Sequence, residues 1–193
     1  MGHWKLRLGV VVVALWMAGG VAQAAPPIGE PAPEDLLGVT PDGEEVRISE
    51  HRGKAMVVSF WASWCGYCRK QFPALDYLQT AAGRDNLRVV VVNFKEAPRE
   101  YRDVRRALRK SSVTWTHDRD GALSEAFGVS SVPHMFIFDK AGKLHAIRRG
   151  YSEESLARTI DLINEVLRQP APDEAAPEVP SGDGGEVAVV VES

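Results

Sequence analysis

The sequence predicts an α/β protein with a mixed central β-sheet flanked by helices and preceded by an N-terminal β-hairpin. Two compact apolar runs, residues 56–61 and 87–94, are typical of strands buried on both faces, and the β-branched block at 89–92 of the second disfavours a helix. Other segments repeat apolar residues every three or four positions, as helices with one buried face do. The chain has 193 residues, 45% of them hydrophobic, which suits one domain with accessory segments.

The first half of the domain is expected to run hairpin, strand, helix, strand. The turn sequence Thr-Pro-Asp-Gly at 40–43 separates two short strand-like runs and predicts a hairpin over residues 34–48. After the first buried strand, residues 65–82 have helical periodicity, and Pro73 predicts a kink inside that helix. The apolar positions that set this period are Phe72, Leu75 and Leu78.

The second half of the domain is expected to contain three helices and a second hairpin. Gly128 ends the short middle helix, and Ala141-Gly142 provides the turn between the hairpin strands. In chain order these elements are a charged helix at 98–110, a loop through 115–121, a short helix at 122–127, strands at 135–139 and 144–149, and an amphipathic helix at 153–167.

Both ends of the chain differ in composition from the domain, which is expected to span residues 25–169. Residues 1–24 combine a short basic start, an apolar run and Ala22-Gln23-Ala24, a pattern that predicts a cleaved signal peptide and a periplasmic protein. The apolar run is short for a hydrocarbon core of ~30 Å, so a membrane anchor is the less favoured alternative. Residues 170–193 hold six acids, four prolines and no Lys or Arg, which predicts a disordered tail.

The charge of the chain excludes general nucleic-acid binding. The net charge is −3, whereas that function needs a clustered excess of Lys and Arg. After the N-terminal segment, no apolar stretch is long enough to cross a membrane.

Cys65 and Cys68 are the only cysteines of the chain, and they lie at the predicted start of the helix over 65–82. A structural disulfide across two residues removes little entropy from the unfolded chain, so stability is a poor reason for this spacing. At a helix N-terminus, unpaired N–H groups and the helix dipole stabilise a thiolate. A second cysteine one turn later can then release a mixed disulfide, so the spacing favours reversible thiol–disulfide exchange.

A metal site is the competing interpretation of the cysteine pair. Two thiolates are only half of the four ligands of a structural zinc site. No ligand-like spacing pairs the five histidines, which are His3, His51, His117, His134 and His145. The sequence therefore predicts neither a metal nor a cofactor. A copper-binding chaperone that uses Cys65, Cys68 and His134 stays open as a non-enzymatic alternative.

The segment around the cysteines resembles the thioredoxin superfamily. Residues 57–68 read Val-Val-Ser-Phe-Trp-Ala-Ser-Trp-Cys-Gly-Tyr-Cys and are similar to the strand and active-site turn of its exported TlpA/ResA-like branch. Pro73 matches the helix kink of that family, and Val132-Pro133 matches its cis-proline loop. Over residues 28–168 the resemblance implies a thioredoxin-like fold and the activity of a protein-disulfide oxidoreductase.

The resemblance also implies roles for single residues. Cys65 would be the exposed nucleophile, Cys68 the buried resolving thiol, and Pro133 a cis-proline beside the disulfide. Substrates would contact the residues around the sulfurs, which are Trp64, Gly66, Tyr67, Val132, Pro133 and His134. The backbone of Val132 would pair with an incoming substrate strand.

His134 directly follows the proline and has two interpretations. A protonated imidazole near the sulfurs would favour the thiolate, whereas an exposed histidine at the edge of a loop would have no role.

Two positions depart from the family pattern. Ser59 stands where thioredoxins carry a buried Asp, and Gln71 stands where ResA-like reductases carry a Glu. Both acids are proton acceptors for the resolving thiol in those relatives. The dipeptide Gly66-Tyr67 also resembles the Cys-Gly-Tyr-Cys motif of periplasmic disulfide isomerases.

The resemblance implies a reductant of exported proteins, acting in cytochrome c maturation or on copper-site thiols. Its partners would be exported proteins that bear thiols or disulfides, and a membrane protein that donates electrons. It would act as a monomer, without cofactor or nucleic acid. The two missing acids and the Gly-Tyr dipeptide favour the alternative, a disulfide oxidant or isomerase.

Overall fold

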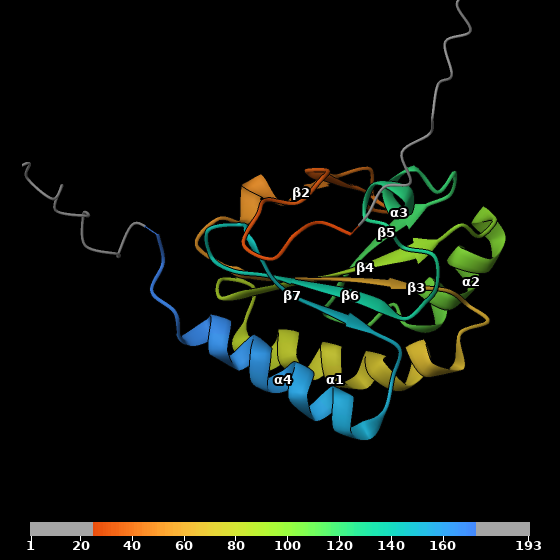
Figure 1. Cartoon of the computed structure of the whole chain (residues 1–193). Helices are drawn as coiled ribbons and strands as arrows, with labels where there is room; N and C mark the ends of the chain where they lie inside the picture. Colours follow the sequence, from red (N-terminus) through yellow and green to blue (C-terminus); the bar gives the residue numbers. More distant parts are fainter. Residues whose placement is uncertain (1–24, 173–193) are drawn as a thin grey trace, which may run out of the picture.

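A five-stranded mixed sheet runs through the middle of the computed structural model, which describes residues 25–172 (Figure 1). The strands β3, β4 and β5 are parallel, whereas β6 is antiparallel to both of its neighbours, β3 and β7. In spatial order the strands are β5 (Thr114–Asp118), β4 (Leu87–Phe94), β3 (Ala55–Trp61), β6 (His134–Phe138) and β7 (Leu144–Arg149).

Helices and a hairpin cover the two faces of this sheet (Figure 1). One face packs against the helices α1 (Gly66–Ala82), α2 (Pro98–Ala107) and α4 (Glu153–Arg168). The other face is covered by α3 (Ala122–Ala126) and by the antiparallel pair β1 (Leu36–Val39) and β2 (Glu45–Arg47), which the short 3-10 helix η1 (Ser49–His51) follows. The predicted α/β architecture with an N-terminal hairpin is confirmed.

The sheet separates two hydrophobic cores, and every residue of β3 is buried. Because successive side chains of a strand point to opposite faces, β3 contributes alternately to each core. Val57 and Trp61 pack on the side of α1, whereas Val58 and Phe60 pack on the side of α3. Both cysteines belong to the core on the α1 side.

The prediction of a loop through residues 115–121 is wrong, because residues 114–118 form β5, which is parallel to β4. This segment, Thr-Trp-Thr-His-Asp, has only one strongly apolar side chain and little strand signal of its own. Its backbone pairs with the edge of β4, and this long-range pairing decides its conformation. At its end the buried carboxylate of Asp118 accepts hydrogen bonds from the backbone N–H groups of Leu123 (3.0 Å) and Ser124 (2.9 Å), which fixes the start of α3.

The charged helix α2 ends at Ala107, three residues before the predicted end. The chain then turns toward α1, where the Asp76 carboxylate binds two consecutive serines. It accepts hydrogen bonds from the Ser111 hydroxyl (2.9 Å) and the Ser112 hydroxyl (2.7 Å). These tertiary contacts end the helix earlier than local periodicity predicts.

Two predictions concern segments at or beyond the ends of the described region. The signal peptide over residues 1–24 lies outside the described residues, as does the tail from residue 173 onward. Over residues 25–172, no helix has the length and apolar composition that a membrane span requires.

Candidate functional site

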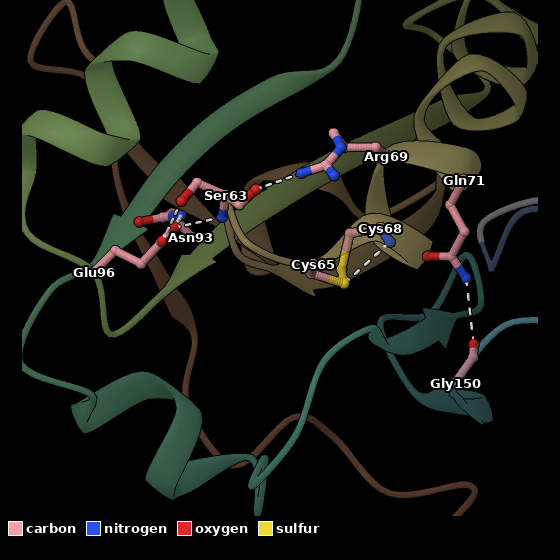
Figure 2. The surroundings of a disulfide bond; sticks show 8 residues. All are labelled: Ser63, Cys65, Cys68, Arg69, Gln71, Asn93, Glu96 and Gly150. Carbon is pink, nitrogen blue, oxygen red and sulfur yellow. Dashed lines mark hydrogen bonds between the residues drawn. A yellow bond between two sulfur atoms is a disulfide. The ribbon is translucent and has the colours of Figure 1, made fainter.

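Cys65 and Cys68 form a disulfide at the N-terminus of α1 (Figure 2). Cys65 is the N-cap residue, and the backbone N–H of Cys68 donates a hydrogen bond to its Sγ at 3.0 Å. This N–H is one of the amide groups at a helix start that lack a partner within the helix. The first cysteine therefore lies where the backbone itself stabilises a negative charge on sulfur.

The disulfide is recessed below its surroundings. Cys65 is only 5% exposed and Cys68 1%, so the expectation of an exposed Cys65 is wrong for this oxidised state. Cys65 packs into the core on the α1 side, whereas the neighbouring Trp64 and Tyr67 are 65% and 58% exposed. The two aromatic side chains thus form the accessible rim, and the sulfurs lie deeper.

The peptide bond between Val132 and Pro133 is cis, as the resemblance implied. It precedes β6, which is antiparallel to β3, and His134 pairs with Phe60. The start of β6 and the end of β3 therefore lie at the same end of the sheet. Val132 packs against both cores, and the carbonyl of Pro133 accepts a hydrogen bond from the N–H of Gly150 at 2.9 Å. The cis-proline loop and the segment leading to Cys65 leave adjacent strands at one end of the sheet.

Trp61 is a core residue beneath the site. Its ring makes edge-to-face contacts with Phe72 (5.4 Å between centroids) and Trp115 (5.3 Å). Trp115 comes from β5, so the strand that the sequence did not predict supplies part of the support of the site. Edge-to-face pairs of this kind stabilise a packed core beyond simple burial.

Tyr67, between the two cysteines, stacks on Tyr151, two residues after the end of β7, with 5.9 Å between ring centroids. The ammonium group of Lys70 lies 5.7 Å from the Tyr67 ring and 5.9 Å from the Tyr151 ring. Nothing in the local sequence relates Tyr151 to the cysteines. The fold brings the two tyrosines together on the surface beside the disulfide.

Both interpretations of His134 are wrong. The residue is 2% exposed, and its ring stacks on Phe136 at 4.8 Å, in the core on the α3 side. The cysteines lie in the other core, so the imidazole and the sulfurs are on opposite faces of the sheet. Burial, with a contribution from the positive charge of Arg149, lowers the pKa of His134 to about 4. The imidazole is therefore neutral at pH 7.

The positions of the two missing acids are buried near the cysteines. Ser59 lies on the α1 side of β3, because it is two residues from both Val57 and Trp61, which belong to that core, and residues two apart in a strand share a face. Gln71 follows Cys68 by three residues in α1, and its amide group donates a hydrogen bond to the carbonyl of Gly150 at 3.5 Å (Figure 2). Neither side chain can take up a proton at neutral pH.

Gln71→Glu is expected to raise the rate of disulfide reduction at pH 7 by roughly tenfold and to flatten its pH profile. Cys68 must become a thiolate while buried, and burial raises the pKa of a thiol. A glutamate facing the Gly150 carbonyl in a buried position would have a raised pKa, which suits a proton acceptor near neutrality. The measurement is the rate against pH for the folded variant, with Ser59→Asp as the matched variant on β3. An unchanged profile in folded Gln71→Glu would show that another group already moves the proton.

A buried carboxylate that the sequence did not single out lies next to the segment before Cys65. Glu96, after β4, accepts hydrogen bonds from Ser63 and Asn93, and Arg69 donates to Ser63 (Figure 2). One signal for these residues was available, because polar residues at the carboxyl ends of parallel strands often line functional sites. Asn93 and Glu96 follow the all-valine stretch of β4 in this way.

The cysteines, Glu96 and the buried histidine do not assemble a metal centre. Over residues 25–172, no group of three or more His, Cys, Asp and Glu side chains is arranged to hold a metal ion. In particular, the copper-site hypothesis needed His134 beside the two sulfurs, and its ring lies on the other face of the sheet.

A family model and similar proteins of known name both relate the chain to thioredoxin-like proteins. Residues 27–165 match the Redoxin family. The thioredoxin-like protein YneN of Bacillus subtilis is 31% identical over 137 residues, which cover 69% of this chain and 79% of YneN. The thiol-disulfide oxidoreductase ResA of Geobacillus thermodenitrificans is 28% identical over 64% of this chain and 70% of ResA.

Solved structures agree with these relatives. The exposed lipoprotein thioredoxin Etrx1 of Streptococcus pneumoniae is 28% identical, with a TM-score of 0.57 over 66% of this chain and 96% of Etrx1. A thiol:disulfide interchange protein of Chlorobium tepidum shares the fold, with a TM-score of 0.62 at 23% identity over 74% of this chain and 99% of its own. The resemblance to the thioredoxin superfamily and the thioredoxin-like fold are thereby confirmed.

Proposed function

The chain belongs to the Redoxin family and is a thiol–disulfide oxidoreductase with thiol-bearing partners, and from this premise we propose that it works as a reductant of exported proteins. The observation that carries the direction of transfer is the position of His134. Strong oxidants of this kind owe their potential to a stabilised reduced form, in which a neighbouring cation favours the thiolate. Here the histidine next to the cis-proline is buried, neutral and on the opposite face of the sheet.

In the proposed reaction, reduced protein transfers two electrons and two protons to a substrate disulfide. The Cys65 thiolate attacks one substrate sulfur, a mixed disulfide forms, and the other substrate sulfur leaves as a thiolate. Cys68 then attacks Cys65 Sγ, so the Cys65–Cys68 disulfide forms and the second substrate thiol is released. The backbone of Val132 would hold the substrate segment, and Trp64, Gly66, Tyr67 and Pro133 would contact it.

Cys65 of the reduced protein is expected to be alkylated before Cys68 at mildly acidic pH. It is the N-cap residue, and the N–H of Cys68 already points at its sulfur, so its thiolate forms at lower pH than that of a free cysteine, for which the pKa is ~8.5. Limited iodoacetamide labelling followed by peptide mass spectrometry measures the order. Preferential labelling of Cys68 would reverse the assignment of the two roles.

The reduction potential of the pair tests the proposed direction. Equilibration with glutathione should give a value near that of thioredoxin, ~−270 mV, if the protein is a reductant. A value of ~−120 to −180 mV would instead indicate an oxidant or isomerase. One observation favours this oxidant or isomerase. Ser59 and Gln71 are buried at the positions where related reductases carry an acid that accepts the proton of the resolving thiol.

The proposal extends to the location and partners of the protein. Residues 1–24 would direct export to the periplasm and be removed, leaving a domain over residues 25–169 and an acidic tail over residues 170–193. A membrane protein would return the monomeric enzyme to its reduced form, and the substrates would be apocytochrome c or copper-site thiols. Intact mass and N-terminal sequencing of the protein from its native compartment test the cleavage, which should leave Ala25 first.

A further inference from the structure

The residue two positions before Cys65 is held by charged side chains of opposite sign (Figure 2). Ser63 follows β3, and Glu96 follows the adjacent parallel strand β4, so both lie at the same end of the sheet. Arg69 lies on α1, directly after Cys68. The turn that carries the nucleophilic sulfur is therefore anchored from a strand end on one side and from its own helix on the other.

Glu96 binds the N-terminal side of this turn. One carboxylate oxygen accepts the backbone N–H of Ser63 at 2.7 Å, and the other accepts the Ser63 hydroxyl at 2.5 Å. The Asn93 amide donates a further hydrogen bond at 2.6 Å, so three donors converge on one buried carboxylate. Hydrogen bonds to a carboxylate are about twice as strong as those between neutral groups, so they fix the Ser63 backbone.

Arg69 binds the same residue through its carbonyl group. Its guanidinium Nη1 donates a hydrogen bond to the Ser63 oxygen at 2.6 Å. The guanidinium also lies close to Gly66, where a Cβ atom added to the glycine would be 3.8 Å from Nη2. The positive charge is thus near the first turn of α1, for which Cys65 is the N-cap residue, but it is exposed to solvent, which weakens its effect.

We propose that Glu96 and Arg69 are positioning residues that hold the Cys65 turn and set the reduction potential of the disulfide in opposite directions. The buried carboxylate disfavours a thiolate on Cys65 and so makes the dithiol a better electron donor. The guanidinium favours the thiolate and acts the other way. This inference rests on the proposed cycling of the Cys65–Cys68 pair and names the residues that would tune it.

The quantity to measure is the equilibrium with glutathione at pH 7. In this exchange one protein disulfide and two glutathione thiols give one protein dithiol and one glutathione disulfide. Glu96→Gln keeps an acceptor for Ser63 and removes the charge, so it is expected to shift the equilibrium toward the dithiol by roughly three- to tenfold. Arg69→Gln is expected to shift it toward the disulfide by a smaller factor, and Arg69→Lys should restore most of the wild-type value.

Matched controls separate charge from simple loss of structure. The exposed pair Glu45 and Arg47 on β2, which lies on the other side of the sheet, offers the same substitutions, and Glu45→Gln and Arg47→Gln should leave the equilibrium unchanged. Ser63→Ala removes one hydrogen bond and no charge, so it should slow exchange without a comparable shift in potential. Because Arg69 is exposed, the Arg69 variants test the proposal even if Glu96→Gln does not fold.

The proposal is overturned if Glu96→Gln and Arg69→Gln shift the equilibrium with glutathione in the same direction. It is also overturned if Arg69→Gln causes no shift, or if a folded Glu96→Gln causes none. A common sign would indicate that both substitutions only loosen the turn. Failure of the proposed function has a different signature, because a wild-type potential in the range of oxidants would contradict the reductant role and leave the opposite signs of the two variants intact.

Discussion

Cys68→Ser is expected to end multiple turnover and to leave substrates covalently attached to Cys65. The variant keeps the thiolate at the helix start, so the first attack still occurs, but no thiol remains one turn later to release the mixed disulfide. We expect the steady-state rate of disulfide reduction to fall by roughly two orders of magnitude or more, since release then depends on external thiols. Non-reducing electrophoresis and mass spectrometry of an extract from the native compartment would identify the trapped proteins.

The matched control for the trapping experiment is Cys65→Ser, which retains only the buried resolving thiol. It should capture almost nothing, because Cys68 is 1% exposed and lies inside the helix. Equal trapping by both single variants would contradict the division of roles between the cysteines. An absence of adducts on Cys68→Ser in an extract that contains oxidised substrates would remove the main support of the exchange mechanism.

The free energy of unfolding at acidic pH is expected to depend on His134. Its pKa is about 4 in the folded protein, because burial disfavours the charged imidazole and Arg149 adds a like charge across the β6–β7 pair. The ordinary value for an unfolded chain is ~6.5. Between these two values the unfolded state binds more protons than the folded state, so the free energy of unfolding rises with pH through this window.

The expected size of this effect is about 3 kcal/mol, present in full above pH 6.5 and lost as the pH falls toward 4. His134→Phe should abolish this contribution, since an apolar ring can stack on Phe136 and face Phe60 without a titrating group. The measurement is the difference in unfolding free energy between wild type and variant at pH 7.5 and at pH 4.5. A difference that does not change between these two pH values would mean that the imidazole is not buried in its neutral form.

Much of the fold could be predicted from the sequence because its central elements are encoded locally. The runs that form β3 and β4 are mostly apolar, with four consecutive valines in β4, and α4 has a clear apolar face within its own segment. Strand β5 could not be predicted in this way, because its backbone is stabilised by pairing with β4 rather than by its own composition. The register of a sheet is a property of two segments, and a single segment carries only part of that information.

Contacts between distant segments also limit what the sequence can predict about the site. Cys65, Cys68 and Pro133 belong to short motifs that the sequence reveals directly, whereas Glu96 acts on Ser63 across 33 residues of chain. The sequence shows that His134 follows the cis-proline, but it does not show which face of the sheet the imidazole occupies. That face is decided by strand parity, since the side chain after Pro133 points away from the α1 side of the sheet.

The recessed position of the disulfide has a consequence for which proteins can react. Thiol–disulfide exchange requires three sulfur atoms to approach along one line, and Cys65 lies below the level of Trp64 and Tyr67. A cysteine held in the middle of a rigid folded surface cannot reach that depth without a clash with the aromatic rim. A cysteine on a loose, extended segment would meet less of this steric barrier. If the pair cycles as proposed, we therefore expect unfolded polypeptides to exchange with it faster than folded proteins whose disulfides are already buried.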